Sequence, residues 1–315
     1  MKITLDISKL LQEGQITQAE FEKLNNLAKN ETGSLAFNVL VGFGVVAISA
    51  GSIMLAPVPA TAIIIGAIAA LFGIGILALE SKQWALLANI AIAIGAFMFA
   101  GGLIMALQGS STAYAIIVLS FLVGAVLARS GLLITASIFA LSGCIGASTG
   151  YWHASYELSI TQPTITIGAF SLIALFAYMI SRYVSNAYEH LAIIAARTAV
   201  FMVNLGFWIG SLWGDTPGYH ASSSYYNSTP MIPDTIFVIG WAVALFVVGV
   251  WGMARNRRWI VNVVTVFGAI HFYTQWFERL GANPTSVLFG GVIMLGIAFI
   301  LRRYNHSKQI PTPIA

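Results

Sequence analysis

The amino-acid sequence predicts an all-α fold, a polytopic transmembrane helical bundle of about ten spans. Hydrophobic residues make up 58% of the 315 positions and charged residues only 8%, and the mean hydropathy is +0.85. A soluble chain carries about 25% charged residues. A span needs about 20 mostly apolar residues to cross a hydrocarbon core of about 30 Å. Cutting the sequence at its polar and turn-forming breaks gives segments of about that length.

The polar segment 1–34 holds nine of the 26 charged residues and precedes the expected transmembrane domain, 35–303, which a short polar tail, 304–315, follows. The breaks at 56–59 and 108–111 are so short that the helices on either side must form tight hairpins. The expected spans are 35–56, 58–79, 84–107, 111–128, 132–151, 163–181, 191–213, 234–254, 259–277 and 284–301.

The basic residues predict the orientation of these spans. If the N-terminus is cytoplasmic, thirteen of the fifteen Lys and Arg residues fall in inside segments, Arg279 falls outside and Arg197 lies within a span. Such an asymmetry follows the positive-inside rule. The count therefore predicts that both termini are cytoplasmic.

The head of the chain, residues 7–28, predicts two short amphipathic helices around a glycine. Gly14 suits the position that ends the first helix, and Thr17 with Glu20 forms a capping box that opens the second. We interpret the segment as a solvated hairpin that packs on the membrane domain or on a second copy of itself. A sensor for a ligand or partner is the alternative. The shared apolar face would consist of Leu10, Leu11, Ile16, Phe21, Leu24 and Leu27.

The expected span 191–213 carries polar residues at seven-residue spacing, His190, Arg197 and Asn204, which places them close to one helical face. Ionisable residues within a membrane are candidates for function. Arg197 is interpreted either as a buried anchor for an anionic substrate or a carboxylate, or as a residue that extends to the headgroups. The first interpretation expects its guanidinium in a polar pocket on the face of Asn204, where lysine would not replace it.

A second polar group lies in the expected span 259–277 and just beyond it, where His271, Gln275 and Glu278 recur at helical spacing. A proton-coupled transporter would use a titratable imidazole in such a position. The alternative is a hydrogen-bonded core histidine beside an interfacial belt formed by Tyr273 and Trp276.

Glycines at four-residue spacing, Gly206, Gly210 and Gly214, form a ridge suited to close helix packing, including self-association between copies. Two outside segments, 152–162 and 214–233, are rich in Tyr, His and Ser. They are interpreted as residues at the headgroup boundary or as a binding surface.

Several classes of function are not predicted. The sequence has no phosphate-binding loop, no His-Glu-x-x-His, no Cys-x-x-Cys and no dinucleotide fingerprint. Cys144 is the one cysteine, and the basic residues are too scattered for nucleic acid. We expect no catalytic residue, no metal site, no cofactor and no nucleic-acid partner; the expected partner is the lipid bilayer.

Two stretches carry a resemblance to known proteins. Leu10-Leu-Gln-Glu-Gly-Gln-Ile-Thr-Gln-Ala-Glu-Phe-Glu22 resembles the helical hairpin that opens a family of bacterial polytopic inner-membrane proteins of unknown function. The run from Val261-Asn262 through His271-Phe-Tyr273 to Phe277-Glu-Arg-Leu280, and a last span closed by Arg302-Arg303, is similar to the same family. The resemblance implies the bacterial inner (cytoplasmic) membrane and no established activity.

Three functions stay open. A secondary transporter-like small-molecule permease fits ten spans that divide into two five-span halves of opposite orientation, as inverted repeats require. A non-transporting membrane scaffold or envelope-stress partner, tethered through the head, fits the same features. A membrane-embedded enzyme is the third.

Overall fold

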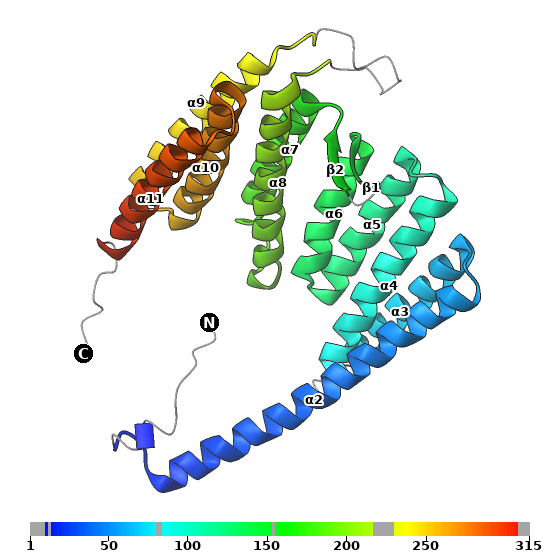
Figure 1. Ribbon diagram of the computed structural model, residues 1–315. Coiled ribbons are helices and arrows are strands. Elements are labelled where there is room, and N and C mark those ends of the chain that lie inside the picture. The colour runs from blue at the N-terminus through cyan, green and yellow to red at the C-terminus, as the bar shows by residue number, and fades with distance from the viewer. Residues whose placement is uncertain (1–9, 12–13, 80–83, 153–154, 217–229, 308–315) are drawn as a thin grey trace. The chain divides into compact units, whose positions relative to one another are not determined.

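The computed structural model describes residues 10–11, 14–79, 84–152, 155–216 and 230–307 (Figure 1). The chain divides into two compact units, Met1–Ala140 and Leu141–Ala315, each of which is described by itself. The helices are α2 (Gln18–Leu55), α3 (Pro59–Ala78), α4 (Ala85–Ala106), α5 (Ser111–Ala128), α6 (Gly131–Cys144), α7 (Pro163–Ile180), α8 (Asn186–Trp213), α9 (Asp234–Ala254), α10 (Arg258–Leu280) and α11 (Pro284–Ser307).

Within the described residues, seven helices are long and apolar enough to cross a membrane: α3, α4, α5, α7, α8, α9 and α10. Shorter apolar helices cover Leu40–Leu55, Gly131–Cys144 and Pro284–Phe299. The bounds of α5 and α9 coincide with the expected spans. The structure thus confirms the apolar, helical architecture of a polytopic membrane protein, and the number of about ten spans stays a prediction.

The expected span 132–151 differs from the structure in its second half. Helix α6 ends at Cys144, and β1 (Ala147–Trp152) pairs antiparallel with β2 (Ser155–Ile160), so this part of the chain forms a β-hairpin. Gly146 has a φ of +98°, which favours glycine and ends the helical path. The hydroxyl of Thr161 donates to the carbonyl of Gly146 at 3.2 Å and closes the base of the hairpin.

The capping box of the head is confirmed. The amide of Glu20 donates to Thr17 Oγ1 at 3.3 Å, and the amide of Thr17 donates to Glu20 Oε2 at 2.8 Å. The hydrogen bonds from Thr17 hold the pKa of the Glu20 carboxyl below its usual value. Gly14 has a φ of +68° and its amide donates to the carbonyl of Leu11, as expected at the end of a helix.

The boundary expected at residue 34 is not marked by a break, because α2 runs continuously from the capping box into the first apolar segment. At the other end, α11 continues to Ser307, beyond the expected end at 301. Residues 7–9 and 12–13 of the expected hairpin and 308–315 of the expected tail lie outside the described residues.

In the first unit, α3 and α4 are packed backbone against backbone. Gly66 and Gly73 of α3, and Gly95 and Gly102 of α4, repeat every seven residues and face the opposite helix. A Cβ atom added to Gly66 would lie 2.5 Å from the amide nitrogen of Phe99, and one added to Gly102 would lie 2.9 Å from the carbonyl of Pro59. The two helices therefore run antiparallel, and at these glycines the backbone of one helix lies against the other.

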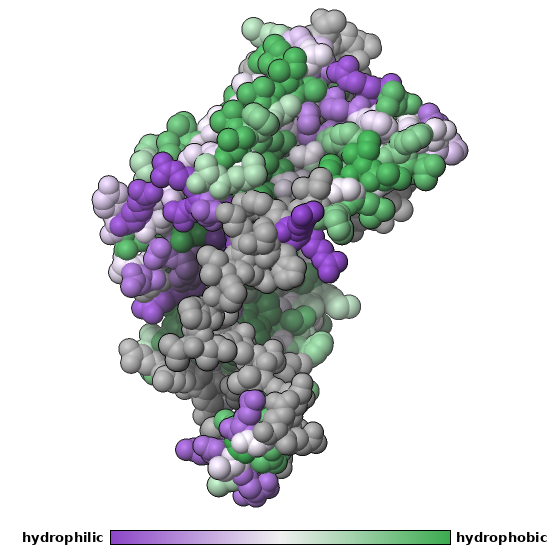
Figure 2. Space-filling view, turned by 90° about the vertical axis from the view of Figure 1, so that its left-hand side faces the viewer, coloured by the Kyte–Doolittle hydropathy of each residue, from purple (hydrophilic) through white to green (hydrophobic). Residues whose placement is uncertain are grey.

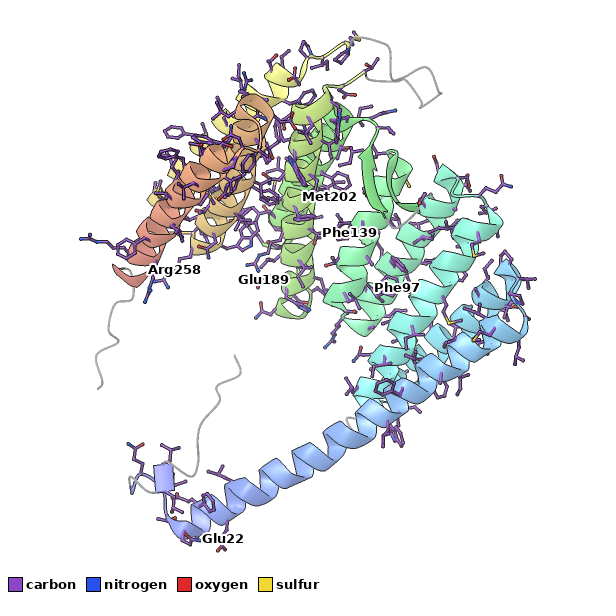
Figure 3. The ribbon with its side chains drawn as sticks, in the orientation of Figure 1. Glu22, Phe97, Phe139, Glu189, Met202 and Arg258 are labelled. Atoms are coloured by element: carbon purple, nitrogen blue, oxygen red, sulfur yellow. The ribbon has the colours of Figure 1, made fainter. Side chains whose placement is uncertain are left out.

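Other helices of this unit meet through side chains. Phe97 of α4, labelled in Figure 3, meets Phe121 of α5 edge to face, with ring centroids 5.5 Å apart. Leu133 of α6 lies against Gly124 of α5. This packing gives α5 a buried stripe, formed by Ala113, Ile117, Phe121, Gly124 and Ala125.

In the second unit, successive helices from α7 to α11 run antiparallel. The start of α7 meets the end of α8 through Thr166 and Gly206, and the end of α8 meets the start of α9 through Gly210 and Phe237. The α9 and α10 pair meets in the same way at Gly252 and Ile260, and α10 and α11 meet where the Trp276 indole donates to the carbonyl of Ser286.

Helices α8 and α10 are also neighbours, and they run parallel. Phe201 of α8 contacts Phe267 of α10, with ring centroids 5.8 Å apart, and the indole of Trp208 donates to Thr274 Oγ1 at 3.0 Å. Both contacts advance in the same direction along the two helices. Helices α8, α9 and α10 therefore form a three-helix group in which every pair is in contact.

The outer face of this group is strongly apolar. Ile236, Ile239, Val243 and Phe246 of α9 are exposed at helical spacing, on the side opposite the buried Phe237, Trp241 and Leu245. Figure 2 shows apolar side chains lying open in broad areas of the surface it presents. Soluble monomers rarely carry apolar patches of this extent.

Candidate functional site

Of the three polar residues expected on one face of α8, only Asn204 is buried, and it is 7% exposed. His190 and Arg197 are exposed. His190 lies in the first turns of α8, next to Glu189, which Figure 3 labels near the start of that helix. Seven residues fall about 20° short of two full turns, and only the position of Asn204 is covered by α9.

Asn204 is held by two hydrogen bonds. The indole nitrogen of Trp241, on α9, donates to its Oδ1 at 3.0 Å, and its own Nδ2 donates to the carbonyl of Val200 at 2.8 Å. Trp241 is 1% exposed and stacks with Phe207 at a centroid distance of 6.5 Å. A buried indole N–H needs such an acceptor, so Asn204 fixes the position of Trp241.

His271 of α10 contacts Trp241. Its ring lies edge-on to Trp241, with centroids 4.9 Å apart and planes inclined by 69°. Its Nδ1 is buried and has no hydrogen-bond partner among the described residues, and the same is true of Nε2 of Gln275, one turn further along α10. We call Asn204, Trp241, His271 and Gln275 the polar cluster.

The remaining expected site residues lie apart from the polar cluster. Glu278 is exposed, one turn beyond Gln275. The guanidinium of Arg197 lies over the ring of Trp259, 5.0 Å from its centroid. The pocket expected for Arg197 beside Asn204 is thus not observed, because the cation is attracted to the face of an indole near the start of α10.

Two residues of this unit were not predicted as site residues. The signal for Trp241 in the sequence is an indole within an apolar span, because a buried indole N–H needs a hydrogen-bond acceptor. Asp215 is fully buried: its Oδ2 accepts from the amide of Thr164 at 2.8 Å, and its backbone pairs with that of Ile232. The carboxylate caps α7, whose N-cap residue Gln162 makes no side-chain cap.

The glycine ridge of α8 packs within the chain. Gly206 faces Ile167 and Thr166 of α7, Gly210 lies under the ring of Phe237, and Gly214 ends the helix with a φ of +70°. The first two are therefore already covered inside the second unit. Self-association through residues 7–28 stays a prediction.

Within the described part of the chain, no group of three or more His, Cys, Asp or Glu side chains comes close enough together to hold a metal ion. Of the two outside segments, 152–162 and 214–233, residues 153–154 and 217–229 lie outside the described residues.

Comparison with known proteins gives little. No family model and no solved structure matches the chain. A stretch of 56 residues is 39% identical to mouse (Mus musculus) sugar phosphate exchanger 3. This stretch covers 14% of the present chain and 11% of the mouse protein. The chain thus matches about a tenth of that relative's length, and over this short stretch it is similar to a protein named as an exchanger.

Proposed function

We propose that the chain is a secondary transporter-like small-molecule permease of the bacterial inner membrane, with about ten spans, both termini in the cytoplasm and no catalytic residue. The lipid bilayer would cover the exposed apolar stripes of its helices. The short similarity to sugar phosphate exchanger 3 agrees with this class of function.

The observation that carries the proposal is the polar cluster. Its four side chains lie between helices that are long and apolar enough to span a membrane, and two of its buried polar atoms have no partner among the described residues. An unsatisfied buried polar atom costs about 1–3 kcal/mol. Polar groups kept at such a cost within a membrane mark substrate or ion pathways.

The contacts around the cluster also suit a transporter. Helices α8, α9 and α10 meet through aromatic side chains, which can change rotamer, rather than through backbone contacts along their whole length. Alternating access needs helices that can repack against their neighbours around a fixed site.

Transport is tested with purified protein in proteoliposomes. The vesicles are shrunk with a concentrated solute, and light scattering follows the recovery of their volume as that solute enters. We expect at least one small polar solute to enter faster than it enters protein-free liposomes. If no solute in a broad panel does so, the permease proposal fails.

The orientation is tested separately with reporter fusions placed after Lys82, Ser130, Ser185 and Asn256. The inside distribution of basic residues predicts that all four report a cytoplasmic position. A periplasmic signal at any of them would contradict the ten-span arrangement at that point.

The second candidate is a non-transporting scaffold or envelope-stress partner, favoured by the α3–α4 pair and by the continuous helix α2. Backbone contact between α3 and α4 suits a rigid support rather than a moving gate. A protein that passes no solute, but whose loss changes the response of the cell to envelope stress, would fit this candidate.

A further inference from the structure

We propose that the polar cluster binds an uncharged, hydroxyl-bearing solute of the polyol or sugar class, through His271 Nδ1 and Gln275 Nε2. This inference rests on the proposed permease function and specifies its substrate class.

The two unpartnered atoms differ in what they can offer. The amide nitrogen of Gln275 only donates hydrogen bonds, whereas Nδ1 of a neutral imidazole can accept one. The two side chains are four residues apart on α10 and therefore lie on the same face, about 5–6 Å apart at their Cβ atoms. A hydroxyl group both donates and accepts, so one hydroxyl can satisfy His271 and Gln275 together.

With Nδ1 as the unprotonated nitrogen of the neutral ring, an anion fits the pair less well, since its oxygens only accept hydrogen bonds and would face the Nδ1 lone pair. A cation fits no better, because the amide N–H groups of Gln275 point positive charge toward the ligand. The chemistry of the two atoms thus favours a neutral solute.

The position of Arg197 also disfavours a phosphorylated ligand. Its guanidinium lies over Trp259, and Trp259 is twelve residues before His271, about 18 Å along α10. A small phosphorylated sugar bound at His271 would not reach that cation. Asn204 has a different part: its Oδ1 holds the indole of Trp241, against which the His271 ring is placed, so Asn204 is a positioning residue.

The test uses two sets of probes that share a carbon skeleton and differ in charge. The first set is glucose, glucose 6-phosphate and glucosamine, and the second is glycerol, glycerol 3-phosphate and 3-amino-1,2-propanediol. Binding to the purified full-length protein in detergent is measured by calorimetry. We expect the neutral member of at least one set to bind at least tenfold more tightly than its charged relatives.

Four variants test whether His271 and Gln275 form the binding site. Gln275→Leu and His271→Phe, which keeps an aromatic ring against Trp241, should each weaken binding of the neutral probe about tenfold or more, equivalent to about 1.4 kcal/mol. Arg197→Gln and the matched amide variant Asn89→Leu should leave binding unchanged. The melting temperature of each variant shows whether it is folded.

The outcomes separate this inference from the permease proposal. If a phosphate or amine probe binds more tightly than the neutral one, or if Arg197→Gln abolishes binding, the substrate class is wrong while the permease can stand. If no probe binds, the two atoms hold water only and the inference fails. If probes bind as expected but no solute crosses the proteoliposome membrane, the permease proposal fails and the binding site stands.

Discussion

Two groups of helices within this chain are packed by opposite means. In α3 and α4, glycines at every seventh position bring the two backbones together, and a Cβ atom at Gly66 or Gly73 would lie 2.5 Å from the opposite backbone. In α8, α9 and α10, large rings separate the helices, and the indoles of Trp208 and Trp241 reach polar partners across the interface. Both groups are apolar enough to lie in a membrane.

The difference shows how a membrane protein can place rigidity and chemistry in different parts of one chain. Lipid tails are as apolar as the side chains, so helix association depends on close packing and on hydrogen bonds between helices. The α3–α4 pair relies on close packing, with its backbones in contact at Gly66, Gly73 and Gly95. The group of α8, α9 and α10 relies partly on hydrogen bonds between helices, and these bonds introduce polar atoms that a ligand can use.

The largest effect is expected for Gly66→Leu, because its side chain would have to displace the backbone of α4 at Phe99. Overpacking usually costs about 1–3 kcal/mol, and a clash with backbone should cost more than about 3 kcal/mol. The melting temperature and the yield of the purified protein measure the loss. Gly75→Leu is the matched control, since nothing lies within 4 Å of a Cβ atom there; equal losses from both variants would mean that the backbone contact has no special role.

A smaller effect is expected for Asn204→Leu. The variant leaves the buried N–H of Trp241 without its acceptor, and we expect the free energy of unfolding to fall by about 1–3 kcal/mol. Denaturation in mixed micelles measures the change. Among the described residues, Asn89 bonds only to the carbonyl of Ala85 on its own helix and is exposed, so Asn89→Leu should have little effect. An unchanged free energy of unfolding for Asn204→Leu would mean that the hydrogen bond from Trp241 does not stabilise this group of helices.

Arg197→Ala should cost less again, about 0.5–1 kcal/mol, the usual value of an exposed cation–π contact. Arg197→Lys should fall between the wild type and alanine, because an ammonium group can also lie over Trp259. Thermal denaturation of the three proteins gives the order. A loss of several kcal/mol with lysine would instead favour the buried, bidentate site expected from the sequence.

The smallest effect is expected for Gln275→Leu in the absence of solute. Removing an amide nitrogen that has no partner among the described residues costs no hydrogen bond, so the free energy of unfolding should stay the same or rise slightly. Denaturation without added solute measures it. A clear destabilisation would show that Gln275 has a partner in the folded protein.

Much of the fold could be predicted from the sequence, because long apolar runs with polar breaks define helices in this class of protein. The bounds of α5 and α9 coincide with the expected spans, and the Thr17–Glu20 capping box follows from residue type and spacing alone. The hairpin after α6 could have been expected from Gly146 and from the Ser, Thr and Tyr residues that follow it, but hydrophobicity alone does not separate a strand from the end of a span.

The candidate site could be predicted only in part. Helical spacing places His271 and Gln275 on one face of α10, and their part in a functional site stays a prediction. Spacing could not show that Asn204 reaches His271 through Trp241, because it gives no information on which helix covers a face. The same limit applies to Arg197. The sequence gives its position along α8, but it does not show that the ring of Trp259 lies beneath its guanidinium.

Helix α2 has a mechanical consequence. Its 38 residues make a rod of about 57 Å, whereas a bilayer core is about 30 Å thick. The Thr17–Glu20 cap and the apolar stretch Leu40–Leu55 belong to this one rod, without a proline or a break in the helix between them. A torque applied at the cap would be transmitted along the rod, so that a molecule bound to the head would turn the exposed side chains of Leu40 and Phe43 with it.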